Sequence, residues 1–295
     1  MFAVPVNGWE AVVDATSGQA SGSGEGIWAG RIDTTVAHPA RRYNYWLGGK
    51  DNFAADRESG DKIASVYPPI KTAARENRAF LQRAVRYLAA EAGIRQFLDV
   101  GTGIPTADNT HEVAQGIAPE SRVAYVDNDP IVLTHARALL QSSPEGATAY
   151  LDADLREPER ILGDPQLRSV LDLSKPVALM LIAIVHFLQD AEQPHKIVRR
   201  LLDALAPGSF LVMSHGTLDL IPPHILARAA DHVAVGRVSF DMIPRPLEEV
   251  SRFFDGLEVV EPGIVPVTEW RPTVPESERP SLAEAAIYGG VARLP

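Results

Sequence analysis

The chain has 295 residues, of which 45% are hydrophobic and 22% are charged, and it has no cysteine. A chain of this length buries roughly 75% of its unfolded surface, which is enough for one large α/β core. The absence of cysteine excludes disulfides, zinc–thiolate sites and thiol catalysis. The formal net charge of −10 argues against a nucleic-acid surface, because such a surface needs clustered cations.

The first third of the chain differs in composition from the remainder. Residues 1–30 lack Lys and Arg and contain Ser-Gly pairs, so we expect a flexible tail without the charged start of a signal peptide. Residues 31–95 hold 12 Lys/Arg against 7 Asp/Glu, whereas residues 96–295 hold 16 against 28. We therefore expect an N-terminal helical lid or extension over 31–95 and a cofactor-binding domain over 96–295. The positive extension would either attract an anionic substrate or be a solvated helix face.

Apolar periodicity predicts the order of helices and strands. A short helix and loop are expected over 33–68, and a helix over 71–92 has an apolar face. Strands are expected over 96–100, 122–127, 147–151, 177–184, 209–214, 257–261 and 285–293. Helices are expected over 106–117, 130–141, 157–163, 194–205 and 246–254. This alternation predicts a mostly parallel sheet with helices on both faces. No apolar run is long enough to span a bilayer, so we expect a cytoplasmic protein without a membrane partner.

A strand followed by two spaced glycines is the strongest local signal. The sequence QFLDVGTG over 96–103 indicates a buried strand that ends in a turn at Gly101 and Gly103, where a ligand approaches the backbone. A second buried strand ends at Asp127, whose carboxylate can accept hydrogen bonds from both ribose hydroxyls. Thr106 stands where a dinucleotide fingerprint has its third glycine. The pattern favours S-adenosylmethionine over NAD, and a plain strand-to-helix turn is the alternative.

Further segments resemble class I methyltransferases that use S-adenosylmethionine. Residues 150–156 resemble the segment that carries an acid to the adenine amino group, and residues 205–212 resemble the L-x-P-G-G turn and fifth strand. Residues 38–53 and 74–81 resemble the R-x-Y-D-Y-L-L-G-G-K-D-N-F and R-E-N-R-A-F-L signatures of one family in that superfamily, once catalogued as a domain of unknown function. Asn44 and Trp46 depart from that signature. The resemblance implies an α/β, Rossmann-like fold with a seven-stranded sheet, and S-adenosyl-L-methionine as the cofactor.

The expected cofactor-binding residues follow from the strand ends and from this resemblance. Asp127 would bind the ribose, Asp154 the adenine, and Asp99 would offer negative charge to the ammonium group. Tyr43 would either lie over the sulfonium or be a core residue of the extension. Arg75 or Arg78 would hold a carboxylate or form ordinary ion pairs on the helix surface. The full expected set is Tyr43, Arg75, Arg78, Asp99, Gly101, Thr102, Gly103, Asp127, Asn128, Asp154, Leu155, Ile182 and Ala183. The histidines show no metal-ligand spacing, so we expect no metal site.

His186 directly follows the expected fourth strand and is the candidate catalytic residue. It would act either as a general base toward an oxygen or nitrogen acceptor or as a structural hydrogen-bonding group. The favoured function is methyl transfer to a small-molecule substrate, with an unknown acceptor and oligomeric state. A non-catalytic sensor of S-adenosylmethionine is the alternative, and an NAD-dependent oxidoreductase is a third possibility that Thr106 disfavours.

Overall fold

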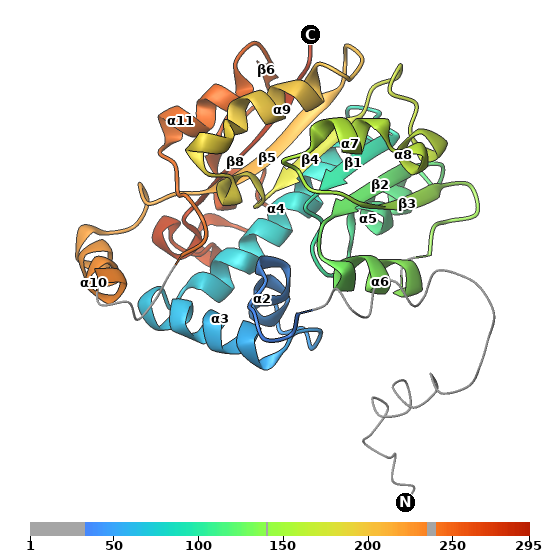
Figure 1. Cartoon of the computed structure of the whole chain (residues 1–295). Helices are drawn as coiled ribbons and strands as arrows, with labels where there is room; N and C mark the ends of the chain where they lie inside the picture. The colour runs from blue at the N-terminus through green and yellow to red at the C-terminus, as the bar shows by residue number, and fades with distance from the viewer. Residues whose placement is uncertain (1–32, 140, 235–239) are drawn as a thin grey trace, which may run out of the picture. The chain divides into compact units, whose positions relative to one another are not determined.

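The computed structural model describes residues 33–139, 141–234 and 240–295 (Figure 1). The tail expected over 1–30 lies outside these residues. Residues Thr34–Pro295 form one compact unit. Within the described ranges, no helix has the length and apolar character needed to cross a membrane.

An eight-stranded sheet forms the centre of this unit. The strands lie in the order β3-β2-β1-β4-β5-β8-β6, and the short β7 also pairs with β8. Their bounds are β1 Gln96–Val100, β2 Arg122–Asp127, β3 Ala147–Asp152, β4 Ala178–Ile182, β5 Phe210–Gly216, β6 Glu258–Val259, β7 Val265–Pro266 and β8 Ile287–Arg293. β1 to β5 are parallel, and β8 runs antiparallel to β5. The expected α/β fold is confirmed, with eight strands instead of seven because of the two-residue β7, which is too short to leave a periodic signal.

The order of the strands places their carboxyl ends at one edge. β1 lies between β2 and β4, so successive connections run in opposite directions from β1. Open α/β sheets bind ligands at such a switch point, outside the carboxyl ends of the strands. Every residue of β1 is buried and so are the first four of β4, as expected for central parallel strands covered on both faces.

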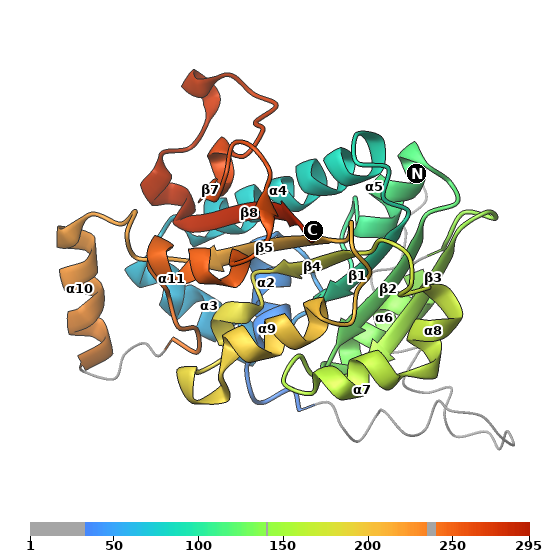
Figure 2. The ribbon, with the colours of Figure 1, turned by 90° about the horizontal axis from the view of Figure 1, so that it is seen from above.

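Helices cover both faces of the sheet (Figure 2). α4 and α5 lie on one face, and α7, α8 and α9 lie on the other. The helix bounds are α2 Pro39–Trp46, α3 Ala54–Val66, α4 Ile70–Ala90, α5 Thr110–Ile117, α6 Pro130–Leu139, α7 Pro158–Gly163, α8 Pro165–Val170, α9 Pro194–Leu202, α10 Pro223–Ala234 and α11 Leu247–Ser251. The apolar face expected for α4 is buried, and it comprises Leu81, Ala84, Val85, Leu88 and Ala89.

The segment before α4 differs from the sequence prediction. It contains two helices, α2 and α3, where one short helix and a loop were expected. α3 begins after Phe53, which has no capping side chain, and Asp56 accepts the Phe53 backbone N–H at 2.8 Å instead. Ile63 and Val66 of α3 pack with Trp46 and with Ala229 of α10, a helix that the sequence analysis did not predict.

Candidate cofactor site

The turn after β1 has the backbone conformation that its glycines predict. Gly101 and Gly103 have φ angles of 77° and 69°, in the left-handed region that favours glycine. A Cβ at Gly101 would lie 2.4 Å from Cγ1 of Ile184, whereas a Cβ at Gly103 would meet no atom within 4 Å. The Thr102 hydroxyl donates to the Asp99 carbonyl at 3.0 Å and fixes the turn. Of the two glycines, Gly103 is therefore the one that leaves space for a ligand beside the backbone.

Asp127 ends β2 directly opposite this turn. Its Oδ2 accepts the Gly103 N–H at 2.8 Å, and its Oδ1 accepts the Asp129 N–H at 2.9 Å. Each carboxylate oxygen keeps a second lone pair, so both can accept one more donor. The side chain is buried, and this burial raises the pKa of Asp127 to about 6 in spite of the backbone donors. The group is thus oriented to accept a pair of hydroxyls.

Asp99 lies deeper than Asp127. Its Oδ2 accepts the Thr110 hydroxyl at 2.6 Å at the start of α5. Burial raises the pKa of Asp99 to about 6, while the Thr110 hydrogen bond and the positive charge of Arg78 act in the opposite direction. An ionised carboxylate at this place has a high desolvation cost, which a cationic ligand group would offset.

Asp154 and Asn128 meet at the ends of β3 and β2. Asn128 Nδ2 donates to Asp154 Oδ2 at 2.7 Å, and Asp154 Oδ1 accepts the Arg156 N–H at 2.8 Å. Leu155, which lies between Asp154 and Arg156 in the sequence, is buried. Arg156 also bonds the Phe187 carbonyl at 3.1 Å, so the loop after β3 is tied to the segment after β4. The structure therefore brings Asp127, Asn128 and Asp154 to one edge, as the sequence predicted.

The two arginines of α4 that the sequence analysis selected, Arg75 and Arg78, differ in their surroundings. Arg78 Nη2 donates to the Ala107 and Asp108 carbonyls and to Asn109 Oδ1, at 3.2, 3.1 and 2.9 Å, and so holds the loop between the glycine turn and α5. Its Nε is buried and has no hydrogen-bond partner among the described residues. Arg75 is exposed and makes no hydrogen bond or ion pair with another described residue. Of these two arginines, Arg78 is the one whose buried Nε lacks an acceptor among the described residues.

Tyr43 takes part in a hydrogen-bonded chain that crosses three elements. Its hydroxyl donates to the Ala74 carbonyl at 2.8 Å and accepts Asn77 Nδ2 at 3.0 Å. The Ser214 hydroxyl donates to Asn77 Oδ1 at 2.6 Å and accepts the Ala183 N–H at 2.9 Å. Asn77 and Ser214 are buried, and the sequence analysis did not select either of them, although Asn77 lies inside the quoted 74–81 signature. The chain links α2, through α4 and β5, to the end of β4.

The end of β4 is strained at the point where this chain reaches it. Ala183 follows Ile182 and has a φ of 53°, which a residue with a Cβ rarely adopts. Its N–H is held by both the carbonyl and the hydroxyl of Ser214, at 3.2 and 2.9 Å. Strain of this kind costs of order 1–3 kcal/mol and is typical of functional sites. Ile182 and Ala183 therefore stand at the same edge as Gly101 and Asp127.

His186 is buried in the turn Val185–Phe187 beyond β4. Its Nδ1 accepts the Gly216 N–H at 3.3 Å, and its ring lies 5.6 Å from that of His215. Burial, and then the nearby His215 and Arg245, hold the pKa of His186 well below its usual value. A neutral ring that accepts at Nδ1 carries its proton on Nε2, and Nε2 then has no lone pair for a substrate proton. The geometry favours the structural alternative, and the base role stays a prediction.

We expect the imidazole of His186 to remain neutral, with the proton on Nε2, at pH values where an ordinary histidine is protonated. Protonation would place a charge in a buried site beside Arg245, which opposes it. Nitrogen NMR of labelled histidine tests this, and the spectrum of a His186→Ala variant assigns the signal. A ring that titrates near pH 7, or that carries its proton on Nδ1, would restore the general-base interpretation.

A groove of about 1260 Å³ lies at the opposite edge of the sheet. Its lining includes Gln96 and Phe210, the first residues of β1 and β5, together with Arg95, Arg122 and Arg293. These strand starts are remote from the carboxyl ends that carry Asp127 and Ala183. The chemistry of the residues and the switch point favour the carboxyl edge as the ligand site, so we do not assign the cofactor to this groove.

Comparison with known proteins shows the family to which the chain belongs. A family model described as S-adenosyl methyltransferase matches residues 26–295. A DUF574 family protein of Streptomyces avermitilis has a similar structure, with 52% identity, a TM-score of 0.83, and coverage of 90% of this chain and 100% of that one. A Thermobifida fusca protein named as a suspected methyltransferase is 42% identical, with a TM-score of 0.79 and coverage of 91% and 99%. No curated protein matches the chain in sequence.

The family model covers nearly the whole compact unit, including α2 and α3 as well as the sheet. Two similar structures extend over the same part of the chain. The chain therefore belongs to the S-adenosyl methyltransferase family, and it is a methyltransferase that depends on S-adenosylmethionine.

Proposed function

We propose that this methyltransferase binds S-adenosylmethionine across the carboxyl ends of β1 to β4 and transfers the methyl group to a small-molecule acceptor. The observation that carries the proposal is Asp127, whose Oδ2 and Oδ1 accept the N–H groups of Gly103 and Asp129 and whose carboxylate keeps lone pairs for further donors. A ribose presents two adjacent hydroxyls, which is the donor pattern that such a carboxylate accepts.

The remaining residues fit the other parts of the cofactor. Arg78 has a buried, unpartnered Nε that would donate to the cofactor carboxylate. Asp99 would offer its negative charge to the ammonium group, and Asp154 would accept the adenine amino group. Gly103 leaves space beside the backbone for the amino-acid part. Arg75, which is exposed, fits this role less well than Arg78.

The chain's own contribution to methyl transfer is alignment. S-adenosylmethionine supplies an already activated methyl group, so the protein must hold the acceptor in line and exclude water. The strained end of β4 would set that line, because the hydroxyl and the carbonyl of Ser214 both accept the Ala183 N–H. Tyr43 acts in this scheme through its hydrogen bonds to α4, and its ring would stand at the site beside Arg78. We therefore expect turnover to depend on position more than on any one proton acceptor.

Two observations support a small acceptor over a macromolecule. The negative net charge disfavours nucleic acid. Two segments also meet beside the end of β4: Arg42 of α2 pairs with Asp241, and the Ile243 N–H bonds the His186 carbonyl at 2.6 Å. These contacts place α2 and residues 241–243 beside the end of β4, where the acceptor would bind, and leave less room there for a large partner.

Thermal unfolding with added ligands tests the cofactor part of the proposal. S-adenosylmethionine and S-adenosylhomocysteine at about 100 times their dissociation constants should each stabilise the fold by about 2.7 kcal/mol. NAD at the same concentration should leave the melting temperature unchanged. Stabilisation by NAD alone would contradict the proposal. Release of S-adenosylhomocysteine with a panel of small amines, phenols and carboxylic acids, compared with protein and RNA substrates, tests the acceptor class.

A further inference from the structure

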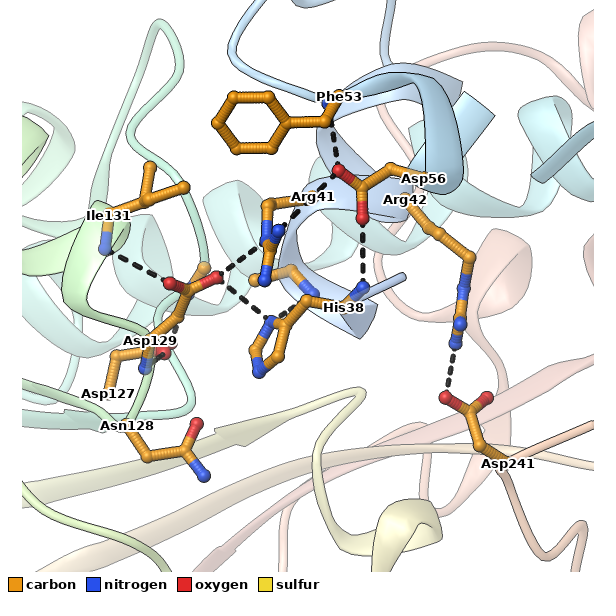
Figure 3. A network of polar contacts seen from close by, with 12 residues as sticks. His38, Arg41, Arg42, Phe53, Asp56, Asp127, Asn128, Asp129, Ile131 and Asp241 are labelled. Atoms are coloured by element: carbon orange, nitrogen blue, oxygen red, sulfur yellow. Dashed lines mark hydrogen bonds and ion pairs between the residues drawn. The ribbon is translucent and has the colours of Figure 1, made fainter. Parts of the chain in front are cut away.

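A buried cluster of charged side chains joins the N-terminal helices to the end of β2. We call Arg41, Asp56 and Asp129 the α2–β2 ion cluster, and His38 lies beside it (Figure 3). Arg41 Nε donates to Asp129 Oδ2 at 3.1 Å, and His38 Nδ1 lies 3.1 Å from the same oxygen. Arg41 Nη1 is 3.8 Å from Asp56 Oδ2. Arg41, Asp56 and Asp129 are only 5%, 0% and 2% exposed, so these charges depend on one another and not on water.

Asp56 fixes the extension side of this cluster. Its Oδ1 accepts the His38 N–H and its Oδ2 accepts the Phe53 N–H, both at 2.8 Å. The starts of α2 and α3 are therefore held by the carboxylate that also faces Arg41. This arrangement gives the guanidinium a defined position relative to both helices.

Asp129 connects the cluster to the proposed ribose site. Its carboxylate accepts Arg41 on one oxygen and the Ile131 N–H, at 3.0 Å, on the other. Its own backbone N–H donates to Asp127 Oδ1 at 2.9 Å. The side chain and the backbone of one residue thus join α2 to the carboxylate that faces the glycine turn. Figure 3 labels Asp56, Arg41, Asp129 and Asp127, the residues of this connection.

We propose that Arg41 and Asp129 are positioning residues for Asp127, through which the N-terminal extension sets the enzyme's affinity for the ribose of its cofactor. The inference rests on the proposed function, because it assigns Asp127 to the ribose. A buried ion pair left with one partner keeps an uncompensated charge, and the turn around it must then move. Such movement would shift the Asp129 N–H and with it Asp127. Asn128 belongs to the same turn and bonds Asp154, so we expect a smaller effect on the residue proposed to bind the adenine.

The test compares two ligands on one set of proteins. Calorimetry measures binding of S-adenosylhomocysteine and of an analogue whose ribose lacks both hydroxyls. The wild-type enzyme should bind S-adenosylhomocysteine at least about tenfold more tightly, as expected for two charge-assisted hydrogen bonds. Arg41→Met should weaken S-adenosylhomocysteine about tenfold and change the analogue less than about twofold. Arg57→Met is the matched control, because Arg57 is exposed and bonds only Asn52 within the extension in the described structure.

Asp129→Asn provides a second variant in case Arg41→Met does not fold. It keeps the backbone donor to Asp127 and a side-chain acceptor for Ile131 but removes the charge that Arg41 and His38 face. We expect the same selective loss for S-adenosylhomocysteine, with circular dichroism as the check on folding. Equal losses for both ligands, or no loss in either variant, would overturn the positioning role. If the wild-type enzyme fails to bind S-adenosylhomocysteine or does not distinguish the two ligands, the proposed ribose site itself is wrong.

Discussion

Replacement of Asp127 by alanine is expected to weaken S-adenosylhomocysteine binding by about 10- to 100-fold, roughly 1.4–2.8 kcal/mol. The variant loses the two acceptors that we assign to the ribose hydroxyls. It also releases the N–H groups of Gly103 and Asp129, which now bond Asp127 at 2.8 and 2.9 Å. Both losses act on the same edge of the sheet, so the effect should be among the largest of any single substitution in the cofactor site.

Isothermal titration calorimetry measures this loss of affinity, and two further variants are compared with Asp127→Ala. Asp127→Asn keeps one side-chain acceptor and the shape of the group, so its loss should be smaller than that of Asp127→Ala. Asp172→Ala removes an exposed carboxylate at the opposite edge and should leave the dissociation constant unchanged. A folded Asp127→Ala protein with wild-type affinity would remove Asp127 from the site.

Replacement of Asp99 by asparagine is expected to stabilise the fold while weakening cofactor binding. Burial raises the pKa of Asp99 from 3.8 to about 6, so ionisation at neutral pH works against folding by up to about 3 kcal/mol. Asparagine retains an acceptor for the Thr110 hydroxyl, which now donates at 2.6 Å. We expect the free energy of unfolding at pH 7.5 to rise by about 1–3 kcal/mol, measured by urea denaturation.

The pH dependence gives the sign of this effect independently. Because the folded pKa lies above the unfolded one, the native protein binds more protons between pH 3.8 and about 6, and wild-type stability from this group falls as the pH rises through that window. The advantage of Asp99→Asn should therefore be small at pH 4 and complete above about pH 6. Asp172→Asn is a control for which we expect a change in stability of opposite sign. Hydrogen bonds from Ser174 lower the pKa of Asp172, so its ionised form favours the folded state. A variant that is no more stable than the wild type at pH 7.5 would contradict the assigned cost of this charge.

Much of the sheet could be predicted from the sequence. The bounds of β1 and β2 agree with the expected strands at 96–100 and 122–127, because buried parallel strands read as short apolar runs between turns. The left-handed glycines at 101 and 103 also follow from sequence, since few other residues adopt that conformation. β8 lies within the strand expected over 285–293.

Contacts between distant residues could not be predicted in this way. Arg41 and Asp129 are 88 residues apart, and Asn77 and Ser214 are 137 apart, so no local period relates them. The family signature contains Arg41 and Asn77 but does not say what they contact. α3 was missed because Phe53 precedes it in place of an ordinary capping residue. The tautomer of His186 depends on a backbone donor from Gly216, 30 positions away, and it too lies beyond local reasoning.

The chain of hydrogen bonds from Tyr43 to Ala183 also bears on how this family diverges. The hydroxyls of Tyr43 and Ser214 each accept one N–H and donate to one oxygen, so Tyr43, Asn77 and Ser214 favour a single arrangement of hydrogens. An aspartate at position 77 would set one acceptor against another, and an alanine at 214 would leave the buried Asn77 Oδ1 without its donor. A substitution at one of these positions is tolerated only together with a matching change at another. We therefore expect the three residues to covary among homologues, although they lie on separate elements.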